Sequence, residues 1–430
     1  MVKRVLEKYK SFNGGKKILI TNFFSLSSAE AANHLLPLIT LPYLVRILGP
    51  ERFGLVAFAQ AFIQYFVLLT NYGFNFTATR NVSIHRNNVD KISRIFSSVM
   101  FIKLSLLVVS FVILTILVLS IQKFRMYLGL YYCCFGFVIG NVLFPIWLFQ
   151  GIERMKFIAA LNLVAKTIFL VAVFIFVKSK ADYLYVPLLT AIGEIIVGIL
   201  GIGILIKKFH IRIQAVHFSD IVTDLKSGWY VFISTAAINL YTASNTVILG
   251  LLTNNTIVGY YSPVEKIIKS CQRLINPVIQ SIYPYISRLS SESKSDALRF
   301  IKKLIKLLGS VYFILSLVIF IFAKQIIYIL LGAQYNQSVV VLRILAFIPL
   351  IVGLASIFAN FFLLGFGYIK EWSRIIIVCS IVSLLFSYVL VYVLSLSYCG
   401  SALSWLLTEF CVLTLSYSTY RRHVHANWCF

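Results

Sequence analysis

Long apolar segments recur along the whole chain, and they constrain its fold more than any other feature. About twelve segments of roughly 20 apolar residues can be counted in its 430 residues. The chain is 60% hydrophobic and 12% charged, with a mean hydropathy of +0.90, a balance that is far from that of soluble globular proteins. Because about 20 apolar residues are enough for a helix to cross a bilayer, we predict an all-α integral membrane protein with about 12 transmembrane helices. Their approximate limits are 18–46, 54–78, 95–120, 127–149, 157–177, 183–206, 228–252, 257–286, 304–328, 339–365, 373–395 and 399–420.

The positive charge of the chain is distributed unevenly between the loops. The formal net charge is +25, which in a soluble protein would suggest nucleic acid as a partner. Here the segments on the side of the N-terminus hold about 26 Lys and Arg residues, against 7 on the other side. Since cytoplasmic loops carry the excess of Lys and Arg, we predict that both termini are cytoplasmic, and we expect no nucleic-acid partner.

The predicted helices divide into two halves. No stretch outside them exceeds about 25 residues, so a soluble catalytic domain has no room. The polar segment 210–227 is interpreted as a cytoplasmic connector between an N-terminal six-helix bundle over 1–209 and a C-terminal six-helix bundle over 228–430. The run ILGPERFGLVAFAQAF returns weakly as ILGLLTNNTIVGYYSPVEK about 205 residues later. The two copies share one direction relative to the membrane, as parallel repeats do, so the substrate path is expected between the halves.

The predicted helix 257–286 carries three cations at membrane depth. Each Lys or Arg that faced lipid there would cost roughly 2.5 to 3.5 kcal/mol. The polar stripe is therefore expected to face a wet cavity, and a cationic cavity in a membrane favours an anionic ligand. The alternative is an interior salt-bridge ladder. At 100° per residue the stripe spans a sector of about 120° that holds Glu265, Lys266, Lys269, Gln272, Arg273, Asn276 and Gln280.

Other polar residues at membrane depth extend the candidate site. Lys166 and Arg343 are cations within predicted helices. Glu30 and His34 lie one helical turn apart and would hydrogen-bond or relay a proton, with an ordinary buried polar pair as the alternative. Together with Glu194 and Glu265 they are candidates for coupling to a proton or sodium gradient. Pro277 follows Arg273 by four residues and predicts a bend at the Arg273 carbonyl.

Motifs of several enzyme and metal-binding classes do not occur. The sequence has no G-x-x-x-x-G-K-[ST] motif, so ATP hydrolysis is not expected. Its seven cysteines include no C-x-x-C pair, and the spacing of its six histidines matches no common metal motif. Neither a disulfide framework, a metal site nor a cofactor is indicated.

Two stretches of the chain resemble a known family. The first is NHLLPLITLPYLVRILGPERFGLVAFAQAFIQYFVLL at 33–69, followed by NYGFNFTATRNVSIHR at 71–86. The second is ILLGAQYNQSVVVLRILAFIPL at 329–350, which has the family's G-x-x-Y and S-V-x-V-L-R-I-L pattern. With these motifs the chain resembles the polysaccharide flippases of bacterial O-antigen synthesis, often called Wzx. The similarity covers the whole chain and is densest in its first 90 residues.

This resemblance implies a fold, a substrate and a location. The fold is that of the multidrug/oligosaccharidyl-lipid/polysaccharide exporter superfamily, in which two bundles of six helices enclose a central cavity that opens to each side in turn. The substrate is an oligosaccharide on undecaprenyl pyrophosphate, moved from the cytoplasmic to the periplasmic leaflet of a Gram-negative inner membrane. The implied partners are membrane lipids, a coupling H⁺ or Na⁺, an O-antigen polymerase and a chain-length regulator.

The implied substrate fits the candidate residues. Lys266, Lys269 and Arg273 would hold the pyrophosphate, with Arg46, Arg52 and Arg80 at the two mouths of the path. Further cavity contacts to the headgroup and the sugars are expected from Lys166, Arg343, Gln60, Gln64, Asn71, Gln272, Asn276 and Gln280.

Two other functions stay open at this stage. A multidrug exporter of the same superfamily is one, although cationic drugs would prefer an acidic cavity. An O-antigen polymerase or membrane glycosyltransferase is the other, although such enzymes usually have a sizeable extramembrane domain.

Overall fold

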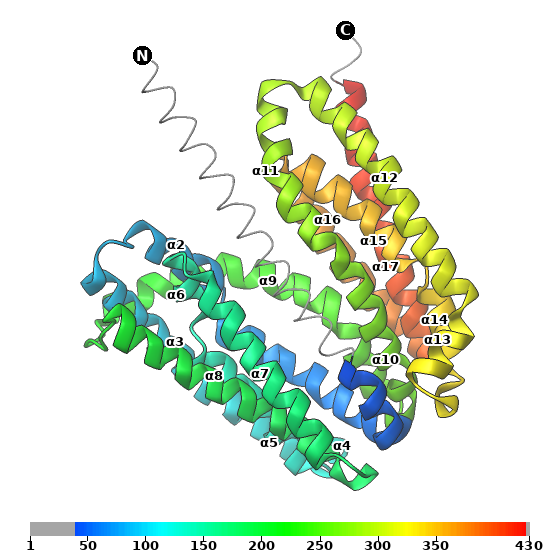
Figure 1. Cartoon of the computed structure of the whole chain (residues 1–430), viewed down its shortest axis with the longest axis horizontal. Coiled ribbons are helices and arrows are strands. Elements are labelled where there is room, and N and C mark those ends of the chain that lie inside the picture. The colour runs from blue at the N-terminus through cyan, green and yellow to red at the C-terminus, as the bar shows by residue number, and fades with distance from the viewer. Residues whose placement is uncertain (1–38, 427–430) are drawn as a thin grey trace.

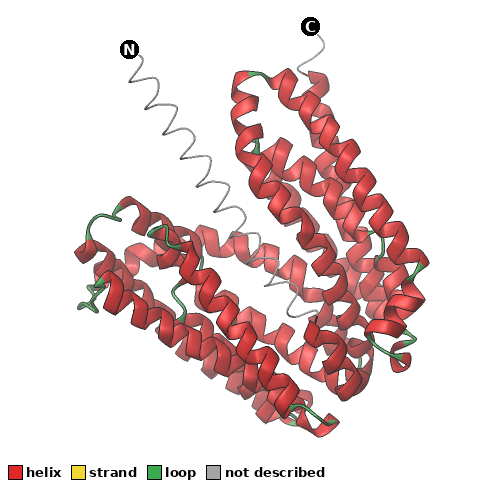
Figure 2. Cartoon of the chain, in the orientation of Figure 1, coloured by secondary structure: helices red, strands yellow, loops and turns green. Residues whose placement is uncertain are grey.

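The computed structural model of the chain describes residues 39–426, which form helices and connecting turns without a strand (Figure 2). Glu30, His34 and the side chain of Gln280 lie outside the described part. The chain is helical over residues 39–71 and continues as α2 (Phe74–Ile84), α3 (Val89–Ser120), α4 (Gln122–Arg125), α5 (Leu128–Leu143), α6 (Ile146–Gly151), α7 (Met155–Phe176), η1 (Lys180–Leu184) and α8 (Tyr185–Phe209). The second half contains α9 (Phe218–Leu252), α10 (Asn255–Gln272), η2 (Arg273–Ile275), α11 (Asn276–Glu292), α12 (Lys294–Ile321), α13 (Ala323–Leu330), η3 (Ala333–Tyr335), α14 (Ser338–Leu345), α15 (Ile348–Ser356), η4 (Ile357–Leu364), α16 (Ile369–Tyr388), η5 (Val389–Val393) and α17 (Ser397–Ala426).

Nine helices within residues 39–426 are long and apolar enough to cross a membrane, so the chain is a multi-pass membrane protein. They are 39–84, 89–120, 128–151, 155–176, 180–209, 294–321, 338–364, 369–393 and 397–424. The predicted spans 228–252 and 257–286 are helical as well, in α9 and in α10 to α11, and are not among these nine. The predicted span 257–286 is divided by the 3₁₀ turn η2, which separates α10 from α11 close to the bend expected at Arg273.

The helical stretch 39–84 is not one straight rod. Gly49 has a φ of +70°, a conformation that glycine adopts without strain, and the chain reverses there. Thr40 and Gln60, on either side of this reversal, line the same cavity. A second change of direction occurs at Tyr72 and Gly73, where φ is again positive before α2 begins. The first of these turns is the Gly49–Pro50 turn that the sequence contains between its first two predicted spans.

Figure 1 shows the helices in two groups that meet near α4, α10 and α14 and diverge toward α2 and α11. The first group contains residues 39–71 and α2 to α8, and the second contains α10 to α17. Helix α9 contacts both groups: its Phe232 ring stacks on Tyr72 at 5.1 Å, whereas its Asn245 side chain accepts a hydrogen bond from Ser387 in α16. The coil after α8 covers residues 210–217 and α9 begins at Phe218, so the division at residue 228 stays a prediction.

The two groups touch through glycine where they meet. A Cβ atom on Gly54 would lie 1.9 Å from the carbonyl oxygen of Asn255, and a Cβ atom on Gly259 would lie 1.8 Å from the carbonyl oxygen of Pro50. Only glycine permits this approach of two backbones. Gly259 follows Gly54 by 205 residues, and Asn255 follows Pro50 by the same number. The contact is therefore reciprocal, as expected where the two copies of a parallel repeat meet at their symmetry axis.

Candidate functional site

A cavity of about 320 Å³ lies between the two groups of helices. One wall is the C-terminal part of α10 with the start of η2, and the other walls come from residues 40–60, α7 and α8. The polar residues that line it are Thr40, Gln60, Thr190, Lys266, Lys269, Ser270 and Arg273. All three cations of the predicted stripe thus face one hollow rather than lipid, and Gln60 lies opposite them.

The spacing of α10 accounts for this arrangement. Lys266, Lys269, Ser270 and Arg273 occupy positions i, i+3, i+4 and i+7, which fall on one face of a helix. Asn254 caps the start of α10 through its side-chain oxygen, which accepts a hydrogen bond from the backbone N–H of Ile257. The opposite face packs into the second group through Val264 and Ile268, which are fully buried. Burial of this apolar face fixes the rotation of α10 and so directs the cations into the cavity.

The three cations have different surroundings. The Lys266 ammonium lies 5.1 Å from the centre of the Phe53 ring, a cation–π contact with the other group. The Arg273 guanidinium projects from the 3₁₀ turn, and the Arg273 carbonyl accepts a hydrogen bond from the N–H of Asn276. Pro277 lies in the first turn of α11, as suits a residue that lacks an N–H. The helix type changes at this point, and the bend that the sequence predicts near Pro277 stays a prediction.

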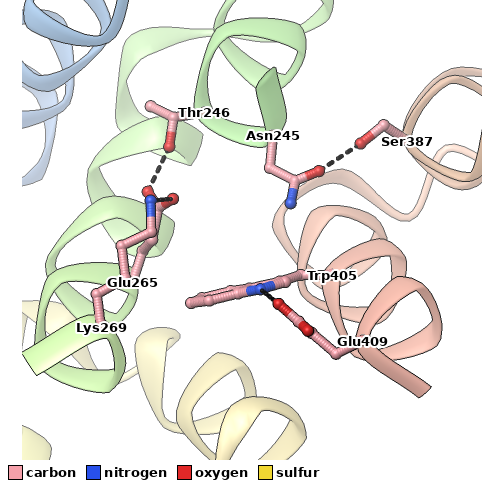
Figure 3. A network of polar contacts seen from close by, with 7 residues as sticks. All are labelled: Asn245, Thr246, Glu265, Lys269, Ser387, Trp405 and Glu409. Carbon is pink, nitrogen blue, oxygen red and sulfur yellow. Dashed lines mark hydrogen bonds and ion pairs between the residues drawn. The ribbon is translucent and has the colours of Figure 1, made fainter. Parts of the chain in front are cut away.

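Lys269 forms an ion pair with Glu265, shown in Figure 3. Its ammonium lies 2.7 Å from a carboxylate oxygen of Glu265, which is 7% exposed and accepts a second hydrogen bond from the Thr246 hydroxyl. Glu265 therefore turns away from the cavity toward α9. The salt-bridge alternative therefore holds for Lys269. With three cations and one carboxylate, the formal charge of the stripe is +2.

The polar contacts behind Lys269 reach α17. The Lys269 ammonium lies 5.7 Å from the centre of the Trp405 ring. The indole N–H of Trp405 donates to the Glu409 carboxylate at 3.1 Å, and both residues are largely buried. Figure 3 shows these side chains on the inner side of α17, facing α9 and α10. A buried network of this kind holds Lys269 in one orientation.

The first group brings a second pair of charges toward the stripe. Lys166 in α7 interacts electrostatically with Glu194 in α8 and with Arg273 of the stripe. Glu194 is held close to α5, because a Cβ atom on Gly140 would lie 2.5 Å from the Glu194 Cβ. The GFVIG run of residues 136–140 has the small-xxx-small spacing of closely packed membrane helices, and the sequence analysis did not use it. The structure thus brings Lys166 and Glu194 near the cations.

Three of the amide candidates line two smaller cavities, and two do not. Gln60 and Gln64 line a second cavity of about 210 Å³ beside the first. Gln64 and Asn71 line a third cavity of about 190 Å³ farther along the same helix. Gln272 at the end of α10 and Asn276 at the start of α11 are half-buried and do not line these three cavities.

The remaining arginines lie away from the stripe. Arg46 donates to the Ile329 carbonyl near the closed end of the molecule, where the two groups of helices meet. The Arg52 guanidinium lies 5.0 Å from the centre of the Tyr183 ring. Arg80 is exposed on α2 at the diverging end, and Arg343 is exposed on α14. None of these four arginines lines the cationic cavity. Arg46, Arg52 and Arg80 thus lie toward the two ends, where mouths of a path were expected.

Several lining residues were not anticipated from the sequence. Thr40, Phe53, Thr190 and Ser270 contribute to the cavity, and Trp405 supports Lys269 from behind. Ser270 follows Lys266 by four residues, so helical spacing alone would have identified it. The others come from different helices, and their positions depend on helix packing. Among the described residues, no group of three His, Cys, Asp or Glu side chains is placed to hold a metal ion.

Comparison with solved structures identifies the fold. An inward-facing multidrug resistance MATE family transporter of the MOP superfamily superposes with a TM-score of 0.74 at 13% identity, covering 91% of this chain and 95% of that chain. The lipid II flippase MurJ in an inward closed conformation gives 0.70 at 14% identity, covering 92% and 87%. This likeness confirms the predicted all-α membrane fold, whereas the twelve helices in two six-helix bundles stay a prediction.

Sequence comparison identifies the family. A relative from Escherichia coli (strain K12) with the name "Putative O-antigen transporter" is 32% identical over 404 residues, covering 94% of this chain and 96% of its own length. A second protein of that name, from Shigella dysenteriae, is 28% identical over 377 residues, covering 86% and 92%. The family model described as polysaccharide biosynthesis protein matches residues 19–290, well over half of the chain. Together with the relative from Escherichia coli, this match shows that the chain belongs to the polysaccharide biosynthesis protein family.

Proposed function

We propose that this chain is a flippase that moves an oligosaccharide linked to undecaprenyl pyrophosphate from the cytoplasmic to the periplasmic leaflet of a Gram-negative inner membrane. It does so by alternating access, without covalent chemistry, with twelve spans in two six-helix bundles and both termini cytoplasmic. The names of its sequence relatives support transport of O-antigen units. The MurJ-like fold is compatible with a lipid-linked substrate.

The observation that carries the proposal is the set of three cations on one wall of the cavity. A pyrophosphate that joins a lipid to a sugar has two ionised phosphate groups, and the stripe has a formal charge of +2 once Glu265 is counted. The Arg273 guanidinium offers bidentate contacts and the two ammonium groups act as point charges. The polyprenyl tail, being apolar, remains in the bilayer while the headgroup crosses.

The direction of opening supports loading from the cytoplasm. The two groups diverge toward α2 and toward the junction of α11 and α12 (Figure 1). Arg80, Arg288 and Lys294 lie in these elements, and the positive-inside rule assigns them to the cytoplasmic side. The cationic cavity then receives a substrate that is assembled in the cytoplasmic leaflet. On release it would supply an O-antigen polymerase and its chain-length regulator.

The decisive experiment measures leaflet exchange of a defined lipid-linked oligosaccharide in proteoliposomes. Arg273→Ala removes charge-assisted hydrogen bonds of about 1.5 to 3 kcal/mol each, so we expect transport to fall roughly 100-fold and surface O-antigen to disappear while the protein stays in the membrane. Arg273→Lys keeps the charge but not the bidentate geometry and should be partly active. Arg374→Ala is the matched control, because Arg374 is exposed on α16 and does not line the cavity.

Normal exchange by Arg273→Ala would overturn the assignment of the cavity. The same assay with and without H⁺ or Na⁺ gradients tests Glu194 and Glu265 as coupling residues. A gradient dependence that survives Glu265→Gln and Glu194→Gln would exclude them.

A further inference from the structure

The third cavity, near the diverging end, has a different chemical character from the cationic one. It lies between the end of the 39–71 helix, the start of α2 and the middle of α9. The described residues that line it include no ionisable side chain. Its polar residues carry carboxamide side chains, apart from one hydroxyl on Thr235, and they are Gln64, Asn71, Asn75, Thr235 and Asn239. Such a lining holds no net charge, so it suits neither an anion nor a cation.

A neutral amide lining matches a ligand rich in hydroxyl groups. A carboxamide presents two N–H donors and one carbonyl acceptor, and a hydroxyl both donates and accepts, so each partner satisfies the other in either direction. Phe76 adds an apolar face to the lining and is 68% exposed. A sugar ring has the same combination of a hydroxyl rim and an apolar C–H face. The cavity therefore has the chemistry of a carbohydrate subsite.

Asn71 is held rigidly in this lining by a buried lysine. The Lys103 ammonium, whose residue is 1% exposed, donates to the Asn71 side-chain oxygen at 3.1 Å. The Asn71 amide nitrogen donates in turn to Asn141 at 3.0 Å. Lys103 does not line the cavity, so it acts through Asn71 as a positioning residue. A side chain fixed from behind in this way loses little conformational entropy when it binds a ligand.

The facing side chains on α9 are oriented as well. The Asn239 amide donates one hydrogen bond to the Thr235 carbonyl at 2.9 Å, and the Thr235 hydroxyl donates to the Val231 carbonyl at 2.7 Å. Each side chain therefore keeps a defined direction. Because α9 contacts both groups of helices, a ligand bound here would be sensed by the helix that connects them.

The cationic cavity and the third cavity, which we call the amide cavity, are linked by shared residues. Gln60 lines both the cationic cavity and the intermediate one, and Gln64 lines both the intermediate cavity and the amide one. From Gln60 to Asn71 the helix rises about 16 Å at 1.5 Å per residue. We propose that the glycan of the lipid-linked substrate lies along this series of amides and is bound by Gln64, Asn71, Asn75, Thr235 and Asn239. This inference rests on the proposed function, since it is the pyrophosphate in the cationic cavity that directs the sugars here.

The test compares binding of two lipids that share a pyrophosphate but differ in their glycans. The probes are undecaprenyl pyrophosphate with one N-acetylglucosamine and the complete lipid-linked repeat unit extracted from a polymerase-deficient strain. The variants are Gln64→Leu with Asn239→Leu, which spare the Lys103–Asn71 contact. Loss of two hydrogen bonds should weaken binding of the repeat-unit lipid about 10-fold and leave the single-sugar lipid within twofold. Asn360→Leu is the control, because its amide donates to Ser356 in its own helix and does not line the cavity.

The outcomes separate this inference from the proposed function. Equal weakening of both lipids by the double variant would mean a structural role and would overturn the glycan subsite, as would unchanged binding of both. Arg273→Ala should weaken both lipids, because it acts on the shared pyrophosphate. Failure of the unsubstituted protein to bind either lipid would overturn the proposed function and the subsite together.

Discussion

The two ends of the molecule are built on different principles. Where the helix groups meet, they touch backbone to backbone through Gly54 and Gly259. The Lys123 ammonium of α4 also donates to the Gly250 and Thr253 carbonyls at the end of α9, a favourable position for a cation. At the diverging end the groups are apart (Figure 1). Side chains there are held in position by contacts within one group, such as Lys103 with Asn71. At the closed end glycine lets the two groups touch each other, whereas at the open end the Lys103 contact lies within one group.

This contrast suggests how the molecule changes state. Glycine surfaces have no side chains to interdigitate, so their separation requires no exchange of rotamers. Packed or buried polar contacts within a group are costly to break and should move with the group as a unit. We therefore expect the alternation between states to open the glycine contact and to leave the Lys103 network intact.

The largest expected effect comes from filling the glycine contact. Gly259→Ala places a methyl group against the Pro50 carbonyl oxygen, where the Cβ distance would be 1.8 Å. Forced overpacking costs typically 1 to 3 kcal/mol or more, so the closed arrangement should lose up to roughly 100-fold in population. Leaflet exchange measures the loss of transport. The substitution Leu48→Cys, made in a protein without its native cysteines, reports on the closed arrangement, because Leu48 is buried there. When Gly259→Ala is added, this cysteine should become reactive to an impermeant thiol reagent.

Gly203→Ala is the control for this substitution, because a Cβ atom there meets nothing within 4 Å. If Gly259→Ala transports normally and the cysteine at position 48 stays protected, the glycine contact does not hold the closed end.

The second effect concerns the diverging end and is of intermediate size. Asn71→Leu removes the side-chain oxygen that accepts a hydrogen bond from the buried Lys103 ammonium. Removal of one partner of a buried charge should lower the free energy of unfolding by about 3 kcal/mol. The double variant Lys103→Met with Asn71→Leu removes both partners and should recover most of that loss. Thermal unfolding in detergent measures all three proteins. Additive losses in the double variant would show that the two residues do not act as a pair.

The smallest effect is expected for an exposed ion pair at the same end. Arg86 in the turn after α2 lies 2.8 Å from Glu153 after α6, and the two side chains are 52% and 68% exposed. Such pairs typically contribute less than about 1 kcal/mol. Glu153→Gln should therefore leave both the melting temperature and transport almost unchanged. A clear loss of either would mean that this contact helps to hold the open end.

Much of the fold and part of the site follow from local sequence rules. Hydropathy predicts the helices, and the 3.6-residue period predicts that Lys266, Lys269 and Arg273 share a face. The weak repeat contains Gly54 and Gly259 at matching positions, although the sequence alone does not indicate that they touch. The resemblance carried by residues 33–86 and 329–350 is confirmed as a family relationship by the comparisons.

The remainder depends on helix rotation and packing. Helical angles group Glu265 with the cations, yet packing of α10 turns its carboxylate toward Thr246. Arg343 was expected in the cavity because it lies in an apolar run, but α14 is a short helix of eight residues and exposes it elsewhere. To predict that Thr235 and Asn239 face Asn71, one must know how α9 crosses between the two groups. No local sequence pattern gives that path.

The 3₁₀ turn at Arg273 has a mechanical consequence. Between residues 255 and 292 the helical bonding pattern changes at this turn, where the Arg273 carbonyl bonds to Asn276 instead of continuing the α-helical ladder. The same residue presents its guanidinium to the cavity. A pull on that guanidinium by a bound anion therefore acts where the α-helical hydrogen-bond ladder of the α10–α11 pair is interrupted. Loading of the headgroup and flexing of this helix pair should consequently occur as one event.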